Sequence, residues 1–233
     1  MFEAHFDTVE QQRKAWTVYS SDPGTDIEER LATRNVSVTH RPLPPGGPGP
    51  YVTIRDDHET ITAVSVGQLE QFLSPSEESL DSAAFGSGLN ETIELFDETL
   101  FRSLDRRQLL FASREIEDRA FRVGRGTLRA LCQTKQSFDA QEALYRRLAT
   151  ETDLDIHSYG TGGWTTPDIE GIEFHTDEDE SLEPYWCLAF DGGPEPAQSC
   201  VLLAREDETG YDGFWSYDAD LVAAIGSEFS AIE

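Results

Sequence analysis

The stretch YWCLAFDGGPEPAQSCVLLARE, residues 185–206, gives the clearest indication of the fold. Its two ends, YWCLAF and SCVLLARE, are strongly apolar runs of the length of a β-strand. Between them, DGGPEPAQ (191–198) is rich in the glycine and proline that interrupt regular structure. This composition is typical of a hairpin loop, so we expect two paired strands here.

Further β-like runs surround this predicted hairpin. LDIHSYG (154–160) and IEFHT (172–176) precede it, and GFWSYD (213–218) follows it. The chain then enters DADLVAAIGSEFSAI (218–232), which we expect to form a final helix. The C-terminal third therefore predicts a meander of strands that ends in a helix.

The N-terminal part shows a similar mixture. Phe2, Phe6 and Val9 stand at helical spacing and predict a helix over 2–14, and AWTVYS (15–20) is typical of a strand. The other elements expected before residue 75 are a short helix at 25–35, a strand at 36–40, a hairpin of strands at 51–57 and 58–65, and a helix at 66–74. The proline-rich PLPPGGPGP (42–50) cannot form a helix or a central strand, so we expect it at a sheet edge.

The composition changes at PSEESLDSAAFGSG (75–88), which is small, polar and acidic. We interpret this as a boundary. The predicted organisation is an N-terminal βαββα-like region at 1–75, an acidic linker or loop at 76–88, and a second domain at 89–233. The two folded parts can also pack as one globular unit.

A helical pattern runs from Asn90 to Glu151. The segments expected to be helical are NETIELFDETLFRSL, RRQLLFASREIEDRAFRV, the segment after GRG, and DAQEALYRRLATE. The order of elements predicts an α+β fold, with mixed β-sheet or sheets packed against a central helical block. An α/β three-layer sandwich is the alternative. Whether the strands on both sides of the block share one sheet stays open at this stage.

The charge balance indicates an environment. Asp and Glu number 45 against 18 Lys and Arg, which gives a net charge of −27 in a chain with 10% aromatic residues. A disordered acidic chain is poor in aromatic residues, so we interpret the charge as a folded surface adapted to molar salt. We expect a halophilic archaeal protein.

The same charge argues against binding to nucleic acid or to anionic membranes, because both normally attract basic surfaces. The N-terminal residues lack the pattern of a signal peptide, and no stretch approaches ~20 consecutive apolar residues. Three cysteines, Cys132, Cys187 and Cys200, match no metal-binding spacing and are expected to be buried reduced thiols. We expect a cytoplasmic protein, with a homodimer possible.

Residues 102–147, here called the basic block, depart from this balance. They contain 11 basic and 6 acidic residues. The excess indicates either a site for an anionic ligand or acidic partner, or arginines that pair with neighbouring carboxylates.

The helix predicted within this block has one unusual carboxylate. At about 100° per residue, Leu109, Ala112, Ile116, Ala120 and Val123 form the buried stripe of the helix, and Leu110 and Phe121 widen the apolar arc. Ser113 and Glu117 lie inside that arc, and Arg114 lies at its edge. On the far side we expect Phe111, Glu115, Asp118, Arg119 and Arg122.

A carboxylate inside an apolar arc must be paired, hydrogen-bonded or protonated. Glu117 therefore forms an internal pair with Arg114, or it lines a ligand cavity together with Ser113 and Arg114. A catalytic role finds no support, since no second acid, histidine or nucleophile is tied to it by the sequence.

GRGTLR (124–129) does not fit a dinucleotide-binding loop, which requires GxGxxG after a strand. We expect Gly124 to end one helix and Thr127 to cap the next. That second helix N-terminus, flanked by Arg125 and Arg129, is also a candidate anion site.

The five histidines are dispersed. His157 and His175 lie in neighbouring predicted strands with Asp177 nearby, so a metal site there is an alternative to ordinary surface histidines. We expect no metal site and no cofactor.

Several of these segments resemble the DICT family of sensory domains, which are associated with diguanylate cyclases and two-component systems. The resemblance rests on ASREIEDRA (112–120), on VGRGTLRA (123–130) followed by Gln133, on YRRLA (145–149), and on the C-terminal strand segments. It covers about residues 86–233 and implies a standalone sensor of halophilic archaea, with a link to light responses and no catalytic activity. The residues expected to bind a ligand or act as a switch are Ser113, Arg114, Glu117, Asp118, Arg125, Thr127 and Gln133.

One departure from the family concerns the pocket. Family members tend to carry a Gly-Phe pair before the glutamine, whereas this chain has Leu131 and Cys132. If that pair shapes a pocket, the pocket of this protein is altered or filled.

The leading hypothesis is a non-catalytic sensor that binds a small molecule or a signalling protein. The alternative is a transcription-associated regulator, in which RAFRVGRGTLRALCQ (119–133) forms a helix-turn-helix and the basic block contacts nucleic acid. An enzyme acting on cyclic nucleotides is a third possibility, for which the sequence supplies no metal ligands.

Overall fold

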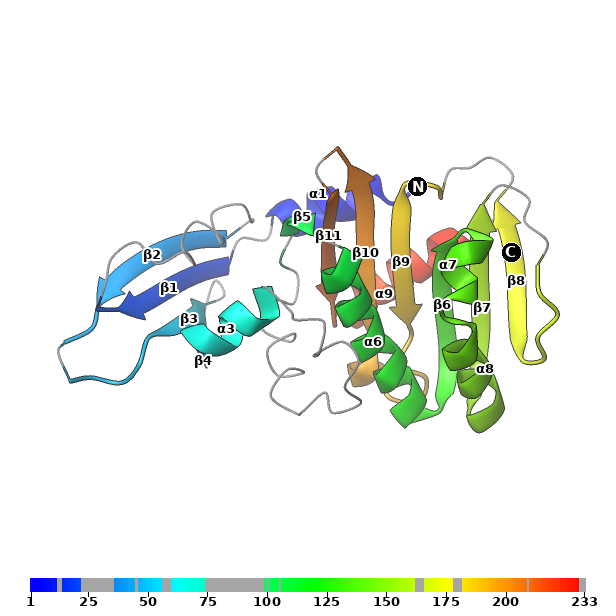
Figure 1. The fold of residues 1–233 in the computed structure, drawn as a ribbon, viewed down its shortest axis with the longest axis horizontal. Helices are drawn as coiled ribbons and strands as arrows, with labels where there is room; N and C mark the ends of the chain where they lie inside the picture. The colour runs from blue at the N-terminus through cyan, green and yellow to red at the C-terminus, as the bar shows by residue number, and fades with distance from the viewer. Residues whose placement is uncertain are drawn as a thin grey trace.

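A computed structural model describes residues 1–11, 14–21, 36–44, 46–55, 60–73, 99, 101–104, 106–161, 166–177, 182–208 and 210–230. Its strands form two separate sheets, one of four strands and one of seven (Figure 1). The strands before and after the helical block therefore do not share a sheet. The predicted helix at 25–35 and the predicted linker at 76–88 lie outside the described residues.

The four-stranded sheet has the order β2-β1-β3-β4. Its strands are β1 (Lys14–Ser20), β2 (Val36–Pro42), β3 (Tyr51–Arg55) and β4 (Thr60–Ser65), and α3 (Val66–Leu73) follows. The predicted hairpin is confirmed, because β3 and β4 are antiparallel. Among the described strands, β2 pairs with β1 alone and lies at the edge, next to the proline-rich segment.

The seven-stranded sheet has the order β5-β11-β10-β9-β6-β7-β8. It is antiparallel from β5 to β6 and parallel from β6 to β8. Its strands are β5 (Phe101–Leu104), β6 (Arg125–Gln133), β7 (Asp153–Thr161), β8 (Ile172–Asp177), β9 (Tyr185–Phe190), β10 (Cys200–Asp207) and β11 (Gly210–Ser216).

The hairpin predicted from residues 185–206 is the antiparallel pair β9–β10 at the centre of this sheet. All six residues of β9 are buried. Trp186 and Leu188 point into one apolar core, whereas Cys187 and Ala189 point into another on the opposite face. The two runs are continuously apolar because both faces of the sheet are covered.

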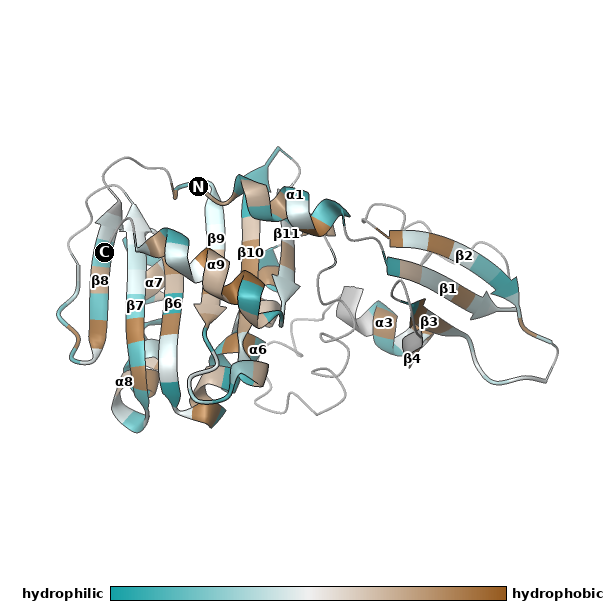
Figure 2. Ribbon diagram, turned by 180° about the vertical axis from the view of Figure 1, so that it is seen from behind, coloured by the Kyte–Doolittle hydropathy of each residue, from teal (hydrophilic) through white to brown (hydrophobic). Residues whose placement is uncertain are grey.

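Helices cover those two faces (Figures 1 and 2). On one face lie α6 (Arg106–Val123), α7 (Lys135–Asp139) and α8 (Glu142–Glu151), and on the other lie α1 (Glu3–Gln11) and α9 (Ala219–Phe229). The α+β prediction is confirmed, with the larger sheet lying between two helical layers. No described helix is long and apolar enough to cross a membrane.

The first helix contributes to the core of the larger sheet. Phe2 and Phe6 of the N-terminal segment are buried with Phe214 of β11 and Phe229 of α9. Glu3 accepts a hydrogen bond of 2.7 Å from the Tyr185 hydroxyl. The N-terminal segment is therefore attached to the sheet that forms from residues 101–216.

Two segments of the predicted helical block are strands instead. Residues 101–104 form β5, and residues 125–133, expected to be a helix after GRG, form β6. The reason lies in an alternation of period two, since Leu128, Ala130 and Cys132 all point into the core under α6. β6 lies between β9 and β7, in the middle of the sheet.

The cysteine prediction is confirmed. Cys132, Cys187 and Cys200 are free and buried. Burial raises the pKa of the Cys132 and Cys200 thiols to about 12, so both stay protonated at neutral pH.

Candidate functional site

Helix α6 lies across the larger sheet and contacts β6, β9, β10 and β11. The buried stripe predicted from its sequence is largely confirmed, because Leu109, Ala112, Ile116 and Ala120 are buried. Gly124 ends the helix as expected, with a positive φ of 71° and its N–H donating to the carbonyl oxygen of Ala120 at 2.8 Å.

Glu117 is buried on this helix, with 1% of its surface exposed. Arg114 Nη1 donates to Glu117 Oε2 at 2.6 Å, so the predicted internal pair is present. The Arg114 side chain remains 35% exposed. Among the described residues, no hydrogen-bond partner reaches the other carboxylate oxygen, Glu117 Oε1.

The pKa of Glu117 is raised from its usual value. Burial is the main cause, because it removes the carboxylate from water. The charge and hydrogen bond of Arg114, and the nearby hydroxyl of Tyr145, oppose the shift without cancelling it. Glu117 is thus a carboxyl group whose protonation state depends on what surrounds it.

A small cavity of about 20 Å³ lies beside this carboxylate. Such a volume accommodates about one water molecule. The cavity is bounded by α6, β6, β9 and the two helices α7 and α8. Its lining residues are Ser113, Glu117, Ala130, Leu131, Cys132, Ser137, Gln141, Tyr145, Trp186, Cys187 and Leu188.

Polar groups converge on the cavity from three sides. Trp186 Nε1 donates to Ser113 Oγ at 3.1 Å across the interface of β9 and α6. Tyr145 of α8 is buried, and the pKa of its hydroxyl is raised well above its usual value by burial and by the Glu117 charge. Small-molecule sites also combine an enclosed space with a few convergent polar groups, although their volume is usually about 300–1,000 Å³.

Leu131 and Cys132 both line the cavity. These are the two residues at which the resemblance implied a departure from the family pattern. The departure noted in the sequence therefore falls on the wall of the cavity.

The prediction for the far side of α6 is partly wrong. Glu115 and Arg119 are buried, with Arg119 Nη2 lying 3.4 Å from Glu115 Oε1. The Arg119 guanidinium also lies over the Tyr217 ring, 4.6 Å from its centroid. Tyr217 follows β11 directly and covers this side of α6. The helical periodicity of α6 alone had predicted that this side faces solvent. Phe111, also expected on the far side, is buried too.

The other predicted site residues lie away from the cavity. Asp118 is exposed and accepts a hydrogen bond from Arg122 on the next turn. Arg125 is exposed at the start of β6. Thr127 N–H donates to Asp191 Oδ1 at 2.9 Å. The backbone of Gln133 ends β6, and its side chain lies outside the described part of the chain.

Two hypotheses about GRGTLR are wrong. Thr127 caps no helix, because it lies within β6, so the proposed anion site at a helix N-terminus does not exist there. For the same reason RAFRVGRGTLRALCQ is a helix followed by a central strand, and it is not a helix-turn-helix.

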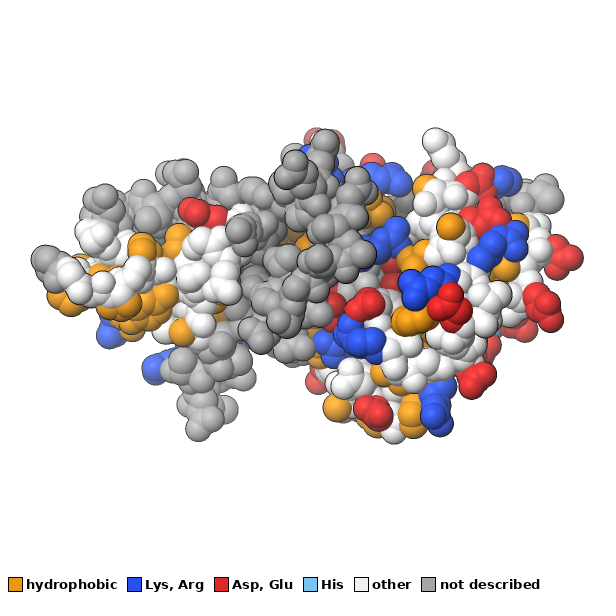
Figure 3. Space-filling model, turned by 60° about the horizontal axis from the view of Figure 1, so that its bottom comes forward, with side chains coloured by type: hydrophobic (Ala, Val, Ile, Leu, Met, Phe, Trp, Pro, Cys, Tyr) orange, Lys and Arg blue, Asp and Glu red, His pale blue; other side chains and the backbone are white. Residues whose placement is uncertain are grey.

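Many cations of the basic block form ion pairs with carboxylates of the same helices. In Figure 3, Lys and Arg side chains are interspersed with Asp and Glu side chains over the part that carries the larger sheet. Helical pairs at i and i+4 account for this pattern. The pairs are Lys135 with Asp139, Arg146 with Glu142, Arg147 with Glu151 and Arg122 with Asp118.

The structure thus brings Ser113 and Glu117 together at one cavity, and Arg114 is paired with Glu117 without lining the cavity itself. Sequence reasoning missed Tyr145, Gln141 and Trp186 as its other polar walls. Tyr145 lies in YRRLA, one of the segments that resemble the DICT family. No local pattern in the sequence predicts that Trp186 contacts Ser113.

Comparison with known proteins bears on the same region. Residues 89–207, just over half of the chain, match the DICT family, described as "Sensory domain in DIguanylate Cyclases and Two-component system". The matched range contains every residue that lines the cavity.

No curated protein matches the chain. Among solved structures, polyphosphate kinase from Porphyromonas gingivalis aligns with 97% of this chain and 48% of its own, with 11% sequence identity and a TM-score of 0.36. The chain spans about half the length of that structure, and a similarity this weak carries no functional argument.

Proposed function

Because the chain belongs to the DICT family of sensory domains, we propose that it senses a small polar molecule at the Glu117 cavity and relays the signal to a partner protein. It acts by binding and not by catalysis. The observation that carries this proposal is Glu117 Oε1, a buried carboxylate oxygen without a hydrogen-bond partner among the described residues, beside a cavity.

The chemistry of the cavity defines the ligand class. An ionised carboxylate accepts hydrogen bonds, and one left unsatisfied in a buried site costs free energy. A ligand that presents an N–H or O–H donor to Glu117 Oε1 removes that cost. The Tyr145 hydroxyl and the Gln141 side chain, which line the same space, supply further hydrogen-bonding groups.

The size of the cavity implies movement. As it stands, about 20 Å³ accommodates a single water, so a larger ligand must displace part of the wall. Helix α7 supplies Ser137 to the cavity wall and has only five residues. Because its displacement breaks few helical hydrogen bonds, α7 is the wall element that we expect to move.

Helix α6 is suited to relay such a change. Glu117 faces the cavity, while the next residue, Asp118, lies exposed and paired with Arg122. A shift or rotation of α6 on binding moves that pair, so Asp118 and Arg122 form the surface that a partner protein can detect. In this proposal Ser113 and Glu117 form the ligand site, Arg114 holds Glu117, and Asp118 belongs to the output surface.

The binding proposal is tested through the Trp186 indole N–H, which lies at the cavity. We expect a screen of small polar metabolites in molar KCl to contain a compound that shifts the Trp186 indole resonance in an NMR spectrum, assigned with Trp186→Phe. Glu117→Gln should weaken this binding by about tenfold or more, the loss of one charged hydrogen bond.

Asp118→Asn is the matched control, because it neutralises the adjacent carboxylate outside the cavity and should retain the shift. If the compounds that bind do so equally well in Glu117→Gln, or if none moves the Trp186 resonance, the cavity is not the sensory site.

We further propose that the protein works in the cytoplasm of a salt-adapted archaeon. A net charge of −27 and three free, buried cysteines support this environment. The link to light responses and the formation of a homodimer stay predictions, testable by absorption spectroscopy of the native protein and by light scattering in molar salt.

A further inference from the structure

A second cluster of functional side chains lies on the opposite face of the larger sheet. β7 and β8 are parallel, with His157 opposite Glu173 and Tyr159 opposite His175. Side chains two apart on a strand share a face. His157, Glu173 and His175 therefore lie beside Tyr159, which packs against Phe229 of α9.

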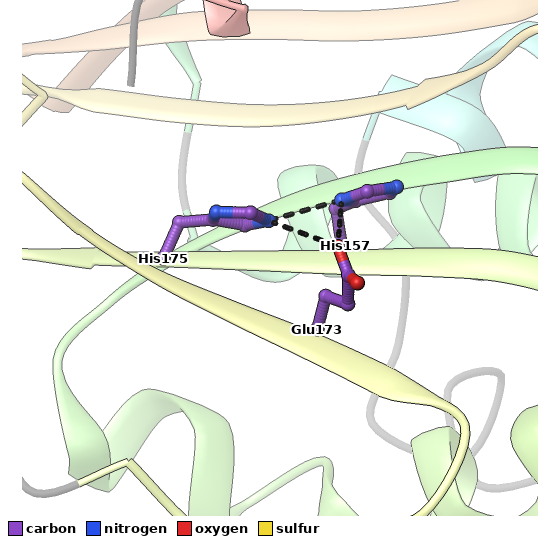
Figure 4. Close-up of side chains that lie close together, drawn as sticks. All are labelled: His157, Glu173 and His175. Atoms are coloured by element: carbon purple, nitrogen blue, oxygen red, sulfur yellow. Dashed lines mark hydrogen bonds and ion pairs between the residues drawn. The ribbon is translucent and has the colours of Figure 1, made fainter. Parts of the chain in front are cut away.

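The three side chains point toward one another (Figure 4). His157 Nδ1 lies 3.0 Å from His175 Nε2. Glu173 Oε2 lies 3.5 Å from His157 Nδ1 and 4.0 Å from His175 Nε2. The sequence predicted that the two histidines could meet, and they do, with Glu173 as the third member of the group. Asp177, which the sequence placed nearby, has its side chain outside the described residues.

These separations are close to those of a metal site. Ligands bound at about 2.0–2.2 Å in a tetrahedron lie about 3.3–3.6 Å from one another. The three distances observed, 3.0, 3.5 and 4.0 Å, lie on both sides of that range. Movements of about 0.5 Å or less in each atom would bring all three to bonding distance of one ion.

The surroundings orient the two imidazoles. His157 Nε2 lies 3.2 Å from Asp155 Oδ2, so a carboxylate faces the nitrogen that points away from the cluster. Metal-binding histidines commonly have this arrangement, which fixes the ring orientation and raises the basicity of the other nitrogen. The His175 ring stacks on Tyr159, with centroids 4.8 Å apart.

Burial of the cluster is asymmetric. The side chains of His157 and His175 are 10% and 14% exposed, whereas Glu173 is 70% exposed. An ion bound here would have imidazole nitrogens on its protein side and an open side toward solvent. Three protein ligands with one open position are typical of exchangeable or catalytic zinc sites.

We propose that His157 Nδ1, His175 Nε2 and Glu173 Oε2 bind one divalent transition-metal ion of the zinc class, with water at the remaining position. Two imidazoles and one carboxylate favour Zn²⁺, Co²⁺ or Ni²⁺ over Mg²⁺ and Ca²⁺, which prefer oxygen ligands. The many surface carboxylates of the chain attract hard cations such as Mg²⁺ and Ca²⁺. A preference for Zn²⁺ over Mg²⁺ therefore distinguishes this site from nonspecific binding at the surface.

The strand that carries His157 lies next to the strand β6 that borders the Glu117 cavity. Ser158 Oγ, on the cavity face of β7, donates to Cys132 Sγ at 3.6 Å, while the neighbouring residue His157 points to the metal side. Metal binding nevertheless stands independently of the sensory proposal, since it uses none of the residues that line the cavity.

The test is zinc titration by calorimetry of the full chain, previously treated with a chelator, in the presence of excess Mg²⁺. We expect one zinc ion per chain. His175→Gln and Glu173→Gln should each weaken zinc affinity by more than about tenfold, and Asp155→Asn, which affects only the outer partner of His157, by about 10- to 100-fold.

His40→Gln is the matched control, because His40 lies in β2 and its ring nitrogen bonds to Ser20 Oγ at 3.0 Å. It should leave zinc binding unchanged. Cobalt absorption in the visible range provides a second readout, with the intense bands of a tetrahedral site expected in the unaltered chain and lost in His175→Gln.

Circular dichroism of each variant establishes that it is folded. If His175→Gln does not fold, Glu173→Gln tests the same site, because that side chain is largely exposed. Zinc binding that Mg²⁺ abolishes, or that is equal in the unaltered chain, His175→Gln and Glu173→Gln, would overturn the proposal and leave the two imidazoles as a direct hydrogen-bonded pair.

Discussion

Glu117 occupies a position where an apolar side chain would be easier to accommodate. A buried ion pair loses most of its Coulomb energy to the cost of leaving water, and its replacement by apolar residues is often neutral or stabilising. Here one partner, Arg114, is partly exposed, which lowers that cost for the arginine alone. The carboxylate is therefore hard to explain by stability, which supports the binding role proposed above.

The raised pKa of Glu117 predicts how stability depends on pH. Below the usual value of 4.5 the carboxyl is protonated in both the folded and unfolded chains. As pH rises from there through the higher pKa of the folded state, the unfolded chain ionises first, so the contribution of this group to the free energy of unfolding falls. Glu117→Gln removes this contribution. We expect the stability of the variant relative to the unaltered chain to increase across this pH window, measured by urea unfolding at constant salt.

The control for this measurement is Asp118→Asn, which removes an exposed carboxylate on the same helix. Its stability relative to the unaltered chain should not show the rise expected of Glu117→Gln. A Glu117→Gln difference that is constant with pH, or that falls as pH rises, would mean that burial does not dominate the pKa of this carboxyl.

At the scale of elements, the sequence predicted the β9–β10 hairpin, the β3–β4 hairpin and the helix α6 correctly. Each has a signal that lies within its own segment of sequence, such as DGGPEPAQ for the first hairpin and the apolar stripe for α6. β6 was missed because its alternation is carried by only three inward-facing residues, Leu128, Ala130 and Cys132, and because it directly follows the helix that ends at Gly124. Its strand state depends on pairing with β9 and β7, which are distant in sequence.

The same distinction applies to the candidate site. Helical period alone placed Ser113 and Glu117 inside the apolar arc of α6. It could not show that Glu115 and Arg119 are buried, because the periodicity of a helix does not tell how widely other elements cover it. Trp186 and Tyr145 reach the cavity only through the packing of β9 and α8, which no local pattern encodes.

The loop between β9 and β10 is fastened to the start of β6. Asp191 Oδ1 accepts hydrogen bonds from the N–H groups of Thr127 and Gly193. Gly193 has a φ of +55°, and a Cβ there would collide with the backbone carbonyl oxygen of Arg125. The backbones approach so closely that only glycine fits.

We therefore predict that Gly193→Ala destabilises the chain by about 2–5 kcal/mol, through left-handed strain and overpacking. Urea unfolding at fixed salt measures it. Gly67→Ala is the control, since its Cβ would meet nothing within 4 Å on helix α3, and it should be neutral or stabilise by up to about 1 kcal/mol. Equal effects of the two substitutions would contradict the fastening of this loop.

At the scale of the whole molecule, net charge dominates. With −27 on one chain, mutual repulsion opposes the compact state at low ionic strength. This value already includes the positive excess of the basic block, so the remainder of the chain is more negative still.

The thermal midpoint of unfolding should therefore rise steeply as KCl increases from about 0.1 M to about 1 M, where the Debye length falls from about 10 Å to about 3 Å. Differential scanning calorimetry measures this. An uncharged osmolyte at equal osmolality is the control, because it does not screen charge and should raise the midpoint much less. A midpoint independent of KCl would remove the support for a salt-adapted origin.

The position of α1 has a consequence for how the chain is made. His5 in α1 and Glu228 in α9 are 223 residues apart, yet their side chains lie 2.6 Å from each other. At about 5–20 residues per second, a ribosome needs about 10–45 s to add the residues between them. The four-stranded sheet can form during that time, whereas α1 has to wait with Phe2 and Phe6 uncovered. Helix α1 is thus synthesised well before the helix that helps to bury it, and chaperones have that interval in which to bind it.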